Sequence, residues 1–413
     1  MKILKTFICT FLIIFLYTFT VYADDEDIEN WGDVPFIINA SSDTSTVPTI
    51  NSRSAIIFDR TSGSVLFGKN ENEKRKMAST TKIMTAIIVI ENSNLDDVVT
   101  ISSKSAGTGG SRLGLHTDDK VSIRDLLYGL LLCSGNDSAV ALAEHVGGSI
   151  DNFAILMNSK VSELGLTSTN FVTPHGLDSD DHYTTAYELA VITNYALKND
   201  VFRKFVGTKN CTISINGHPK NLSNTNELLG NLDGVYGVKT GFTNGANRCL
   251  VTSLKRDNMD LICVVLGADT KKDRTKDSVN LIEYAFKNFK SINLREKVMN
   301  EFANWKICNT SSFIVKKGCS NNIDAVLEDL PYDFFPINCN HIDDISIYIY
   351  CNTNLEAPLV ENSIIGYLTI SIDNKTVLTL NIYNSNSINK KSCFNFFNDI
   401  IKKYTYYLES LCY

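Results

Sequence analysis

Apolar residues dominate residues 83–90. They recur at helical spacing and fill most of the surface of a helix: Ile83, Met84, Ala86, Ile87, Ile88, Val89 and Ile90. A helix that is apolar on nearly all sides is expected in the interior of a domain rather than on its surface. The pattern therefore predicts a buried central helix that begins just after residue 80.

Other segments around this helix predict a mixture of strands and helices. Residues 54–58 and 64–68 are β-rich runs on either side of a Gly-containing turn, which is typical of a hairpin. Further strands are predicted at 234–241, 248–254 and 259–266, and further helices at 121–133, 138–145, 185–198 and 276–289. Strands at both ends of a mostly helical middle indicate one α+β domain, which we place at residues 51–290.

The pattern changes after about residue 295. Residues 344–350 and 366–372 alternate with period two, and a turn at 373–375 leads into a further strand. This predicts a small all-β domain, β-sandwich-like, over residues 291–390. Residues 391–413 return to helical spacing with an apolar side: Phe397, Ile400, Ile401, Tyr404, Leu408 and Leu411. This amphipathic helix is expected either to lie in a membrane interface as a peripheral anchor or to pack on its own domain.

The N-terminus has the three parts of a secretory signal. Lysines precede an apolar run from Phe7 to Phe19, and small residues stand at the cleavage positions up to Ala23. Because the run is short for a membrane span, we expect residues 1–23 to be a cleaved signal peptide rather than an uncleaved anchor. An acidic, Ser/Thr-rich leader follows over residues 24–50. The protein is then expected to be exported, to the cell envelope at the outer face of the cytoplasmic membrane or beyond it.

Composition excludes several functions. The net charge is −7 with no basic block, so a nucleic-acid partner is not expected. The eleven cysteines are scattered, without C-x-x-C or Cys/His spacing, so no metal site and no cofactor is predicted. Disulfides and buried free thiols remain equal alternatives for the exported cysteines.

The chemistry of the chain centres on Ser79 and Lys82, at the start of the predicted buried helix. Residues three apart share one helix face, so the hydroxyl and the amine can meet. Burial favours the neutral amine, which can then act as a base toward the serine. Taken alone, Ser79 is better explained as a helix cap, because S-x-x-K also occurs by chance, as at 387–390.

Two further motifs follow in order, and each stands at an element boundary. Ser134-Gly135-Asn136 offers a hydroxyl to relay a proton and an amide to hold the substrate. Lys239-Thr240-Gly241 offers a second cation, which favours a neutral Lys82, a hydroxyl for a substrate carboxylate, and a glycine that lets the substrate lie along a strand. The backbone N–H of Phe242 can join that of Ser79 in an oxyanion hole. Together the motifs form the signature of penicillin-binding proteins and class A β-lactamases.

The chain resembles the serine D-alanyl-D-alanine carboxypeptidases, which are low-molecular-mass penicillin-binding proteins. Besides the three motifs, the resemblance rests on residues 174–177 (Pro-His-Gly-Leu), 224–229 and 237–243. It implies a β-lactamase-like transpeptidase domain with an antiparallel sheet and a helical cluster. By context, Arg274 matches the family's arginine that binds the terminal carboxylate, although a solvated charge is the alternative. His175 is expected to support its loop, and Cys133 to pack rather than to act as a nucleophile.

The function that the resemblance implies is removal of the terminal D-Ala from peptidoglycan stem pentapeptides through an acyl-enzyme on Ser79. Peptidoglycan stem peptides are then the substrates, and β-lactam antibiotics are covalent inhibitors. A DD-endopeptidase and a non-catalytic penicillin- or wall-binding protein are the alternatives. A class A β-lactamase is disfavoured, because the stretch from Glu227 to Asn231 lacks that family's usual pattern for the deacylating glutamate.

Overall fold

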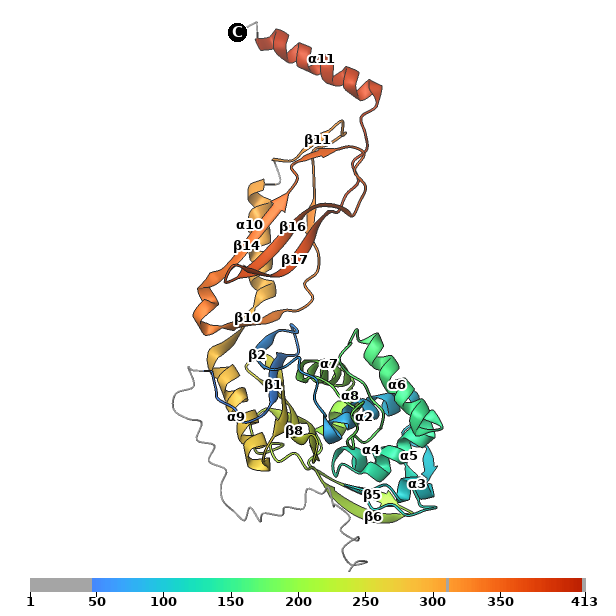
Figure 1. The fold of residues 1–413 in the computed structure, drawn as a ribbon. Coiled ribbons are helices and arrows are strands. Elements are labelled where there is room, and N and C mark those ends of the chain that lie inside the picture. Colours follow the sequence, from blue (N-terminus) through green and yellow to red (C-terminus); the bar gives the residue numbers. More distant parts are fainter. Residues whose placement is uncertain (1–46, 310–311, 411–413) are drawn as a thin grey trace, which may run out of the picture. The chain divides into compact units, whose positions relative to one another are not determined.

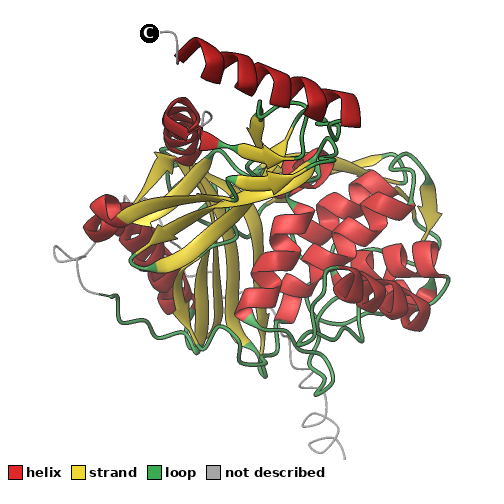
Figure 2. Ribbon diagram, turned by 90° about the horizontal axis from the view of Figure 1, so that it is seen from above, coloured by secondary structure: helices red, strands yellow, loops and turns green. Residues whose placement is uncertain are grey.

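The computed structural model describes residues 47–309 and 312–410. The predicted signal peptide and nearly all of the predicted leader therefore lie outside the described residues. The described chain divides into two compact units, with the boundary between Lys287 and Asn288. Figure 1 shows the elements of both units, and Figure 2 distinguishes helices from strands.

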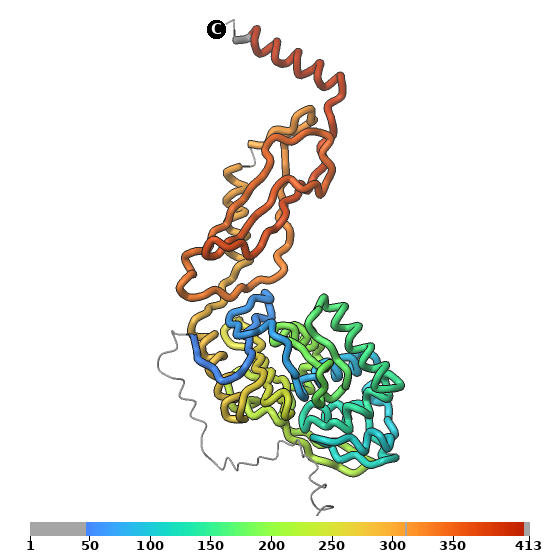
Figure 3. Tube along the Cα trace, in the orientation of Figure 1, coloured from blue at the N-terminus to red at the C-terminus, as the bar shows by residue number. Residues whose placement is uncertain are grey.

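The first unit is built around a five-stranded antiparallel sheet in the order β2-β1-β9-β8-β7. Its strands are β1 (Ser54–Asp59), β2 (Val65–Lys69), β7 (Val235–Thr243), β8 (Asn247–Arg256) and β9 (Met259–Ala268). β1 pairs with β9 from Ser54 opposite Leu266 to Asp59 opposite Leu261, so segments more than 200 residues apart in sequence lie side by side (Figure 3). The predicted hairpin and all three later strands are confirmed.

Helices cover both faces of this sheet (Figures 1 and 2). One face carries α9 (Lys271–Asn288), and the other carries a helical cluster. The cluster contains α2 (Lys82–Asn92), α3 (Ser103–Ala106), α4 (Ile123–Leu131), α5 (Asn136–Gly147), α6 (Ile150–Glu163), α7 (Ala186–Ala196) and α8 (Asp200–Val206). Residues 82–89 of α2 are all buried, as the apolar pattern predicts for a central helix. The α+β prediction for this unit is confirmed.

Two short antiparallel pairs complete the first unit. They join β3 (Val98–Thr100) to β4 (Lys120–Ser122) and β5 (Asn210–Ile215) to β6 (His218–Ser223). A 3₁₀ turn, η1 (Ala78–Thr81), leads directly into α2 and contacts β7 and β8 of the main sheet. The start of the central helix thus lies against the strand that carries Lys239.

The second unit contains a four-stranded sheet in the order β12-β17-β16-β14 and two further strand pairs, β10-β13 and β11-β15. The strands are β10 (Phe289–Asn293), β11 (Ile314–Lys316), β12 (Ala325–Leu327), β13 (Phe334–Asn338), β14 (Ile345–Cys351), β15 (Asn354–Glu356), β16 (Ser363–Ile372) and β17 (Lys375–Asn384). A 3₁₀ segment, η3 (Cys339–Asp344), precedes β14.

The all-β prediction for the second unit is incomplete, because the unit also contains α10 (Leu294–Asn309). Leu294, Val298 and Phe302 are the buried residues of this helix, one buried residue per turn. So narrow an apolar stripe gives little helical signal in the sequence. Phe289, predicted on the inner face of the preceding helix, instead begins β10.

The chain ends in α11 (Cys393–Ser410), whose side chains from Cys393 to Leu408 are exposed except that of Asp399. Among the described residues, no helix combines the length and the apolarity that crossing a bilayer requires. The nine cysteines of the described chain are all free thiols, so none of the alternative disulfides is formed among them.

Candidate active site

Ser79 lies in the 3₁₀ turn that precedes α2. Ala78, directly before it, has a φ of +48°, in the left-handed region that few residues other than glycine adopt. Neither η1 nor α2 is capped by a side-chain hydrogen bond, so the helix-cap interpretation of Ser79 is wrong. Strain held at one residue of a turn is a feature of sites where a side chain must be presented in one orientation.

Lys82 is fully buried, and its amine has three partners. Lys82 Nζ lies 2.7 Å from Ser79 Oγ, 2.7 Å from Asn136 Oδ1 and 3.0 Å from the carbonyl oxygen of His175. Burial lowers the pKa of Lys82 well below its usual range, and repulsion from Lys239 lowers it further. A neutral amine has two N–H groups and one lone pair. Because the amide and carbonyl oxygens can only accept, the lone pair is left for the Ser79 hydroxyl.

Ser134 and Asn136 lie where α4 gives way to α5. Ser134 has a φ of +62°, and its buried hydroxyl has no hydrogen-bond partner among the described residues. Asn136 uses both ends of its amide, because Nδ2 donates to the carbonyl of Gly109 at 2.8 Å while Oδ1 contacts Lys82. In this motif the Ser134 hydroxyl is therefore available to a substrate, and the Asn136 amide orients Lys82.

Asp137, which the sequence analysis did not single out, fixes the loop that faces this motif. Its buried carboxylate accepts hydrogen bonds from the backbone N–H groups of Leu113, Gly114 and Leu115 at 2.8–3.0 Å. Ser138 N–H donates to it as well, at 2.9 Å. A buried carboxylate that accepts several N–H groups is well satisfied, so this residue anchors the loop.

The strand β7 places the third motif against η1, the turn over residues 78–81 that carries Ser79 and is called the nucleophile turn below. Gly241 lies so close that a Cβ there would stand 3.0 Å from Ser79 N, which explains the glycine. Lys239 is buried, and its Nζ donates to the carbonyl of Thr240 at 3.0 Å. Thr240 shares a hydrogen bond with the hydroxyl of Thr225 at 2.8 Å. Gly241 thus lies directly against the turn that carries Ser79.

Phe242 and Arg248 form a stacked pair at the end of the same strand. They lie opposite one another in β7 and β8, and the guanidinium carbon of Arg248 stands 3.7 Å from the centre of the Phe242 ring. A cation over an aromatic face is attractive, so the pair fixes the side chain of Phe242. This leaves the backbone of Phe242 as the group that can serve the reaction.

The loop over residues 173–182 joins these parts. The carbonyl of His175 accepts from Lys82, and that of Pro174 accepts from the Thr85 hydroxyl at 2.6 Å. The carboxylate of Asp178 binds the Thr243 hydroxyl at 2.7 Å and the Gly245 N–H at 2.8 Å, beyond the end of β7. The prediction that His175 supports its loop agrees with its ring, whose Nδ1 accepts from Leu177 N–H. No sequence signal marks its carbonyl as a partner of Lys82.

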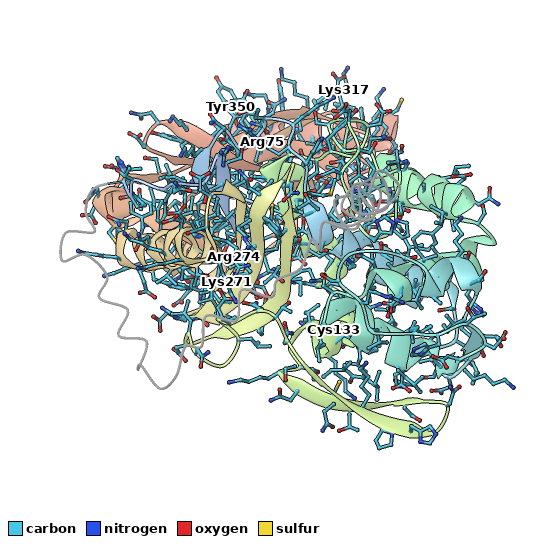
Figure 4. All side chains as sticks on the ribbon, turned by 60° about the horizontal axis from the view of Figure 1, so that its bottom comes forward. Arg75, Cys133, Lys271, Arg274, Lys317 and Tyr350 are labelled. Atoms are coloured by element: carbon cyan, nitrogen blue, oxygen red, sulfur yellow. The ribbon has the colours of Figure 1, made fainter. Side chains whose placement is uncertain are left out.

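Arg274, labelled in Figure 4, lies in α9. It is buried, so the alternative of a solvated charge is wrong, and it forms an ion pair with Glu227. Burial alone would raise the pKa of Glu227, but attraction to Arg274 and a hydrogen bond from Thr275 outweigh it and lower that pKa. Arg274 also acts electrostatically on Cys249, the residue opposite Gly241 in the sheet.

Cys133, also labelled in Figure 4, lies next to Ser134. Burial raises the pKa of its thiol to about 11, with a smaller contribution from Asp137. Its Sγ donates to the carbonyl of Gly129 at 3.0 Å. A thiol with so high a pKa is not a nucleophile at neutral pH, in agreement with the packing role predicted for it.

Two buried histidines give this region a pH-dependent stability. Burial lowers the pKa of His175 to about 3 and that of His182 to about 4, from 6.5. As the pH falls below 6.5 the unfolded chain binds these protons first, so stability is complete above pH 6.5 and decreases below it. We expect a loss of roughly 2 kcal/mol for each histidine between pH 7.5 and 5. Urea unfolding midpoints over this range measure it. His182→Gln should reduce the loss by about half, and a flat profile contradicts the prediction.

The chain is similar to known proteins over most of its length. Residues 41–270 match the family model Peptidase_S11, described as D-alanyl-D-alanine carboxypeptidase. The chain is 33% identical over 331 residues to the D-alanyl-D-alanine carboxypeptidase DacF of Bacillus subtilis, covering 79% of this chain and 82% of that protein. It is also 33% identical over 343 residues to DacA of Escherichia coli, with 80% and 82% covered.

Solved structures give the same relationship. Penicillin binding protein 5 from Haemophilus influenzae superposes with a TM-score of 0.69 at 30% identity, covering 84% of this chain and 99% of that one. The Streptomyces K15 DD-transpeptidase has a TM-score of 0.56 at 34% identity, and it covers 59% of this chain and 99% of its own. The first match extends over both units, and the second is limited to little more than half of the chain.

Proposed function

The chain belongs to the D-alanyl-D-alanine carboxypeptidase family, and we propose that it removes the terminal D-alanine of peptidoglycan stem pentapeptides through an acyl-enzyme on Ser79. It is a serine-type peptidase, a hydrolase of the penicillin-binding-protein class. The contact that carries the proposal for Ser79 is the 2.7 Å approach of Lys82 Nζ to Ser79 Oγ, made by an amine whose other two partners only accept.

In the proposed acylation step, the lone pair of Lys82 takes the hydroxyl proton as Ser79 Oγ attacks the carbonyl carbon of the penultimate D-Ala. The oxyanion that forms is stabilised by the backbone N–H groups of Ser79 and Phe242. Collapse of this intermediate breaks the C–N bond. The leaving amine receives a proton from Lys82 through the Ser134 hydroxyl, and free D-Ala departs.

We assign substrate binding to the third motif, on strand β7. The Thr240 hydroxyl and the positive charge of Lys239 suit the terminal carboxylate, and Gly241 leaves room for the peptide along β7. Arg274 is buried and paired with Glu227, which offsets most of its charge, so we assign it a supporting role in substrate binding rather than direct contact with the terminal carboxylate. Asn136 can offer its second amide hydrogen to the substrate while it orients Lys82.

Deacylation requires a water molecule to attack the Ser79 ester. In class A β-lactamases a glutamate activates this water. Glu227, which the sequence brought into question for that role, is committed to Arg274 and Thr275. This supports a carboxypeptidase in preference to a β-lactamase, and it predicts a penicilloyl-enzyme that turns over slowly.

A test of the reaction uses a muropeptide pentapeptide and a cross-linked muropeptide dimer in separate incubations. We expect free D-Ala from the pentapeptide, and none from the Ser79→Ala variant. Cleavage of the dimer with no D-Ala from the pentapeptide would show an endopeptidase instead. Acylation by penicillin without any peptide product would show a binding protein.

We further propose that the chain is exported, on the strength of its first 23 residues. A charged start, an apolar run and a small-residue site are together what a signal peptidase requires. A mature protein that begins at Asp24 is the expected result, and retention of Met1 in the envelope fraction would favour the uncleaved anchor.

We also propose that α11 binds the membrane interface. Its exposed apolar residues include Phe397, Ile400, Tyr404 and Leu408, each at least half exposed. Exposure of this much aromatic and aliphatic surface on one helix is typical of segments that insert at the lipid boundary. The side-chain charges of residues 393–410 balance, with Asp399 and Glu409 against Lys402 and Lys403.

Co-sedimentation of the full chain with vesicles tests this anchor. Because the helix charges balance, we expect similar binding to zwitterionic and to anionic vesicles, and loss of binding when residues 391–413 are deleted. Phe397→Asp is expected to weaken it and Lys402→Asp to leave it nearly unchanged. Undiminished binding after the deletion would contradict the proposal.

A further inference from the structure

His182 lies outside the groups that take part in the proposed reaction, yet it is almost fully buried beside the nucleophile turn. We propose that His182 is a positioning residue, which holds the backbone that presents Ser79 by acting through Thr81. The inference rests on the proposed function, because it concerns the rate of the same acylation step. Both ring nitrogens are engaged elsewhere, so His182 does not touch the reacting atoms.

The hydrogen bonds around His182 can run in only one direction. The backbone N–H of Val172 donates to Nδ1 at 3.1 Å, so this nitrogen carries the lone pair. The ring proton is therefore on Nε2, which lies 2.8 Å from the hydroxyl oxygen of Thr81. Thr81 accepts this proton and donates its own to the carbonyl of Ala78, also at 2.8 Å.

The end of this chain of hydrogen bonds is the residue that needs support. Ala78 holds a φ of +48°, which is costly for a residue with a Cβ and persists only when its surroundings fix it. Ser79 follows Ala78, and Lys82 follows Thr81. A polarised Thr81 hydroxyl thus sets the approach of both members of the catalytic pair.

The surroundings keep the ring neutral and in place. Burial lowers the pKa of His182 to about 4, so the ring stays neutral at physiological pH, with one donor and one acceptor. Its edge packs on Phe171, with ring centres 5.6 Å apart and an angle of 73° between the planes. An aligned donor in a buried site strengthens the next hydrogen bond in the series.

Two substitutions of His182 separate its two nitrogens. Glutamine can place an amide N–H near the position of Nε2 and keep the donor to Thr81. Asparagine reaches only the position of Nδ1 and leaves Thr81 without that donor. We expect His182→Asn to lower the rate of acylation by a β-lactam by about 10- to 100-fold, because small displacements of a nucleophile have effects of this size. The KM for peptide should change little, and His182→Gln should recover the rate to within about threefold.

A double-mutant cycle tests the path through Thr81. Thr81→Val keeps the side-chain shape and removes the hydroxyl, so it should lower the acylation rate as His182→Asn does. The double variant should be no slower than Thr81→Val alone. Thr193→Val is the matched control, since it removes an equally buried hydroxyl that donates to Leu189 within α7 at 2.7 Å, and it should keep the wild-type rate.

Two results would overturn the positioning role. One is a folded His182→Asn or Thr81→Val variant with the wild-type acylation rate, and the other is a double variant slowed by the product of the single effects. Should His182→Asn fail to fold, the Thr81→Val and Thr193→Val pair decides on its own. A wild-type chain that β-lactams do not acylate would instead refute the proposed function, and the positioning role with it.

Discussion

Replacing Lys82 by methionine is expected to reduce the rate of Ser79 acylation by at least about 10³-fold, the usual contribution of a general base at a buried serine. Methionine follows the unbranched lysine side chain as far as Cε but has no basic group that can take a proton from Ser79. Stopped-flow acylation by a chromogenic cephalosporin measures the rate, and circular dichroism establishes that the variant is folded.

The same substitution tests whether the amine is neutral. Acylation by the wild type should rise with pH as the amine loses its proton, since only the neutral form is a base. Lys82→Met should remove this dependence together with the rate. Lys104→Met, at an exposed lysine of α3, is the control and should behave as the wild type. A folded Lys82→Met chain that is acylated within tenfold of the wild-type rate would contradict the assignment of the base.

Gly176→Ala is expected to reduce acylation by about 10²-fold or more, although Gly176 contacts no substrate in the proposed reaction. A Cβ at Gly176 would lie 1.9 Å from the carbonyl oxygen of Ala78 and 2.6 Å from the hydroxyl of Thr81. Neither the backbone of the turn nor the buried threonine can move aside freely. The nucleophile turn must therefore shift, and Ser79 shifts with it.

Backbone conformation contributes to this effect as well, and a matched control separates the two. Gly176 has a φ of +88°, where alanine is strained by about 1–2 kcal/mol. Gly165 has a φ of +71° but no atom within 4 Å of the Cβ that alanine would add. Gly165→Ala should therefore lower the thermal stability and keep the acylation rate. Equal rates for the two variants would show that the contact with Ala78 has no role in catalysis.

The sequence predicts the part of the site that consists of side chains, because these side chains belong to three motifs that follow one another in a recognisable order. Lys82 contacts both Ser79 and Asn136, and Lys239 lowers the pKa of Lys82 as the second cation. The apolar pattern also predicts the buried helix that supports Ser79, because a helix that is buried on every side is apolar at nearly every position.

The remainder of the site depends on backbone groups, which a sequence does not distinguish. The His175 carbonyl that completes the environment of Lys82 could belong to any residue in that place. The same holds for the N–H groups that Asp137 collects and for the left-handed turn at Ala78. The helix α10 was missed for a different reason, since it buries only one residue per turn, while other apolar residues such as Met299 and Ile307 are exposed and blur the helical pattern.

The central claim is that Ser79 forms the covalent intermediate, and the mass of the protein after incubation with benzylpenicillin tests it most directly. We predict one penicilloyl group per chain, located by peptide mapping on the peptide that contains Ser79. The Ser79→Ala variant should gain no mass under the same conditions. An adduct that persists in Ser79→Ala, or that maps to Ser134 or another residue in the wild type, would contradict the account.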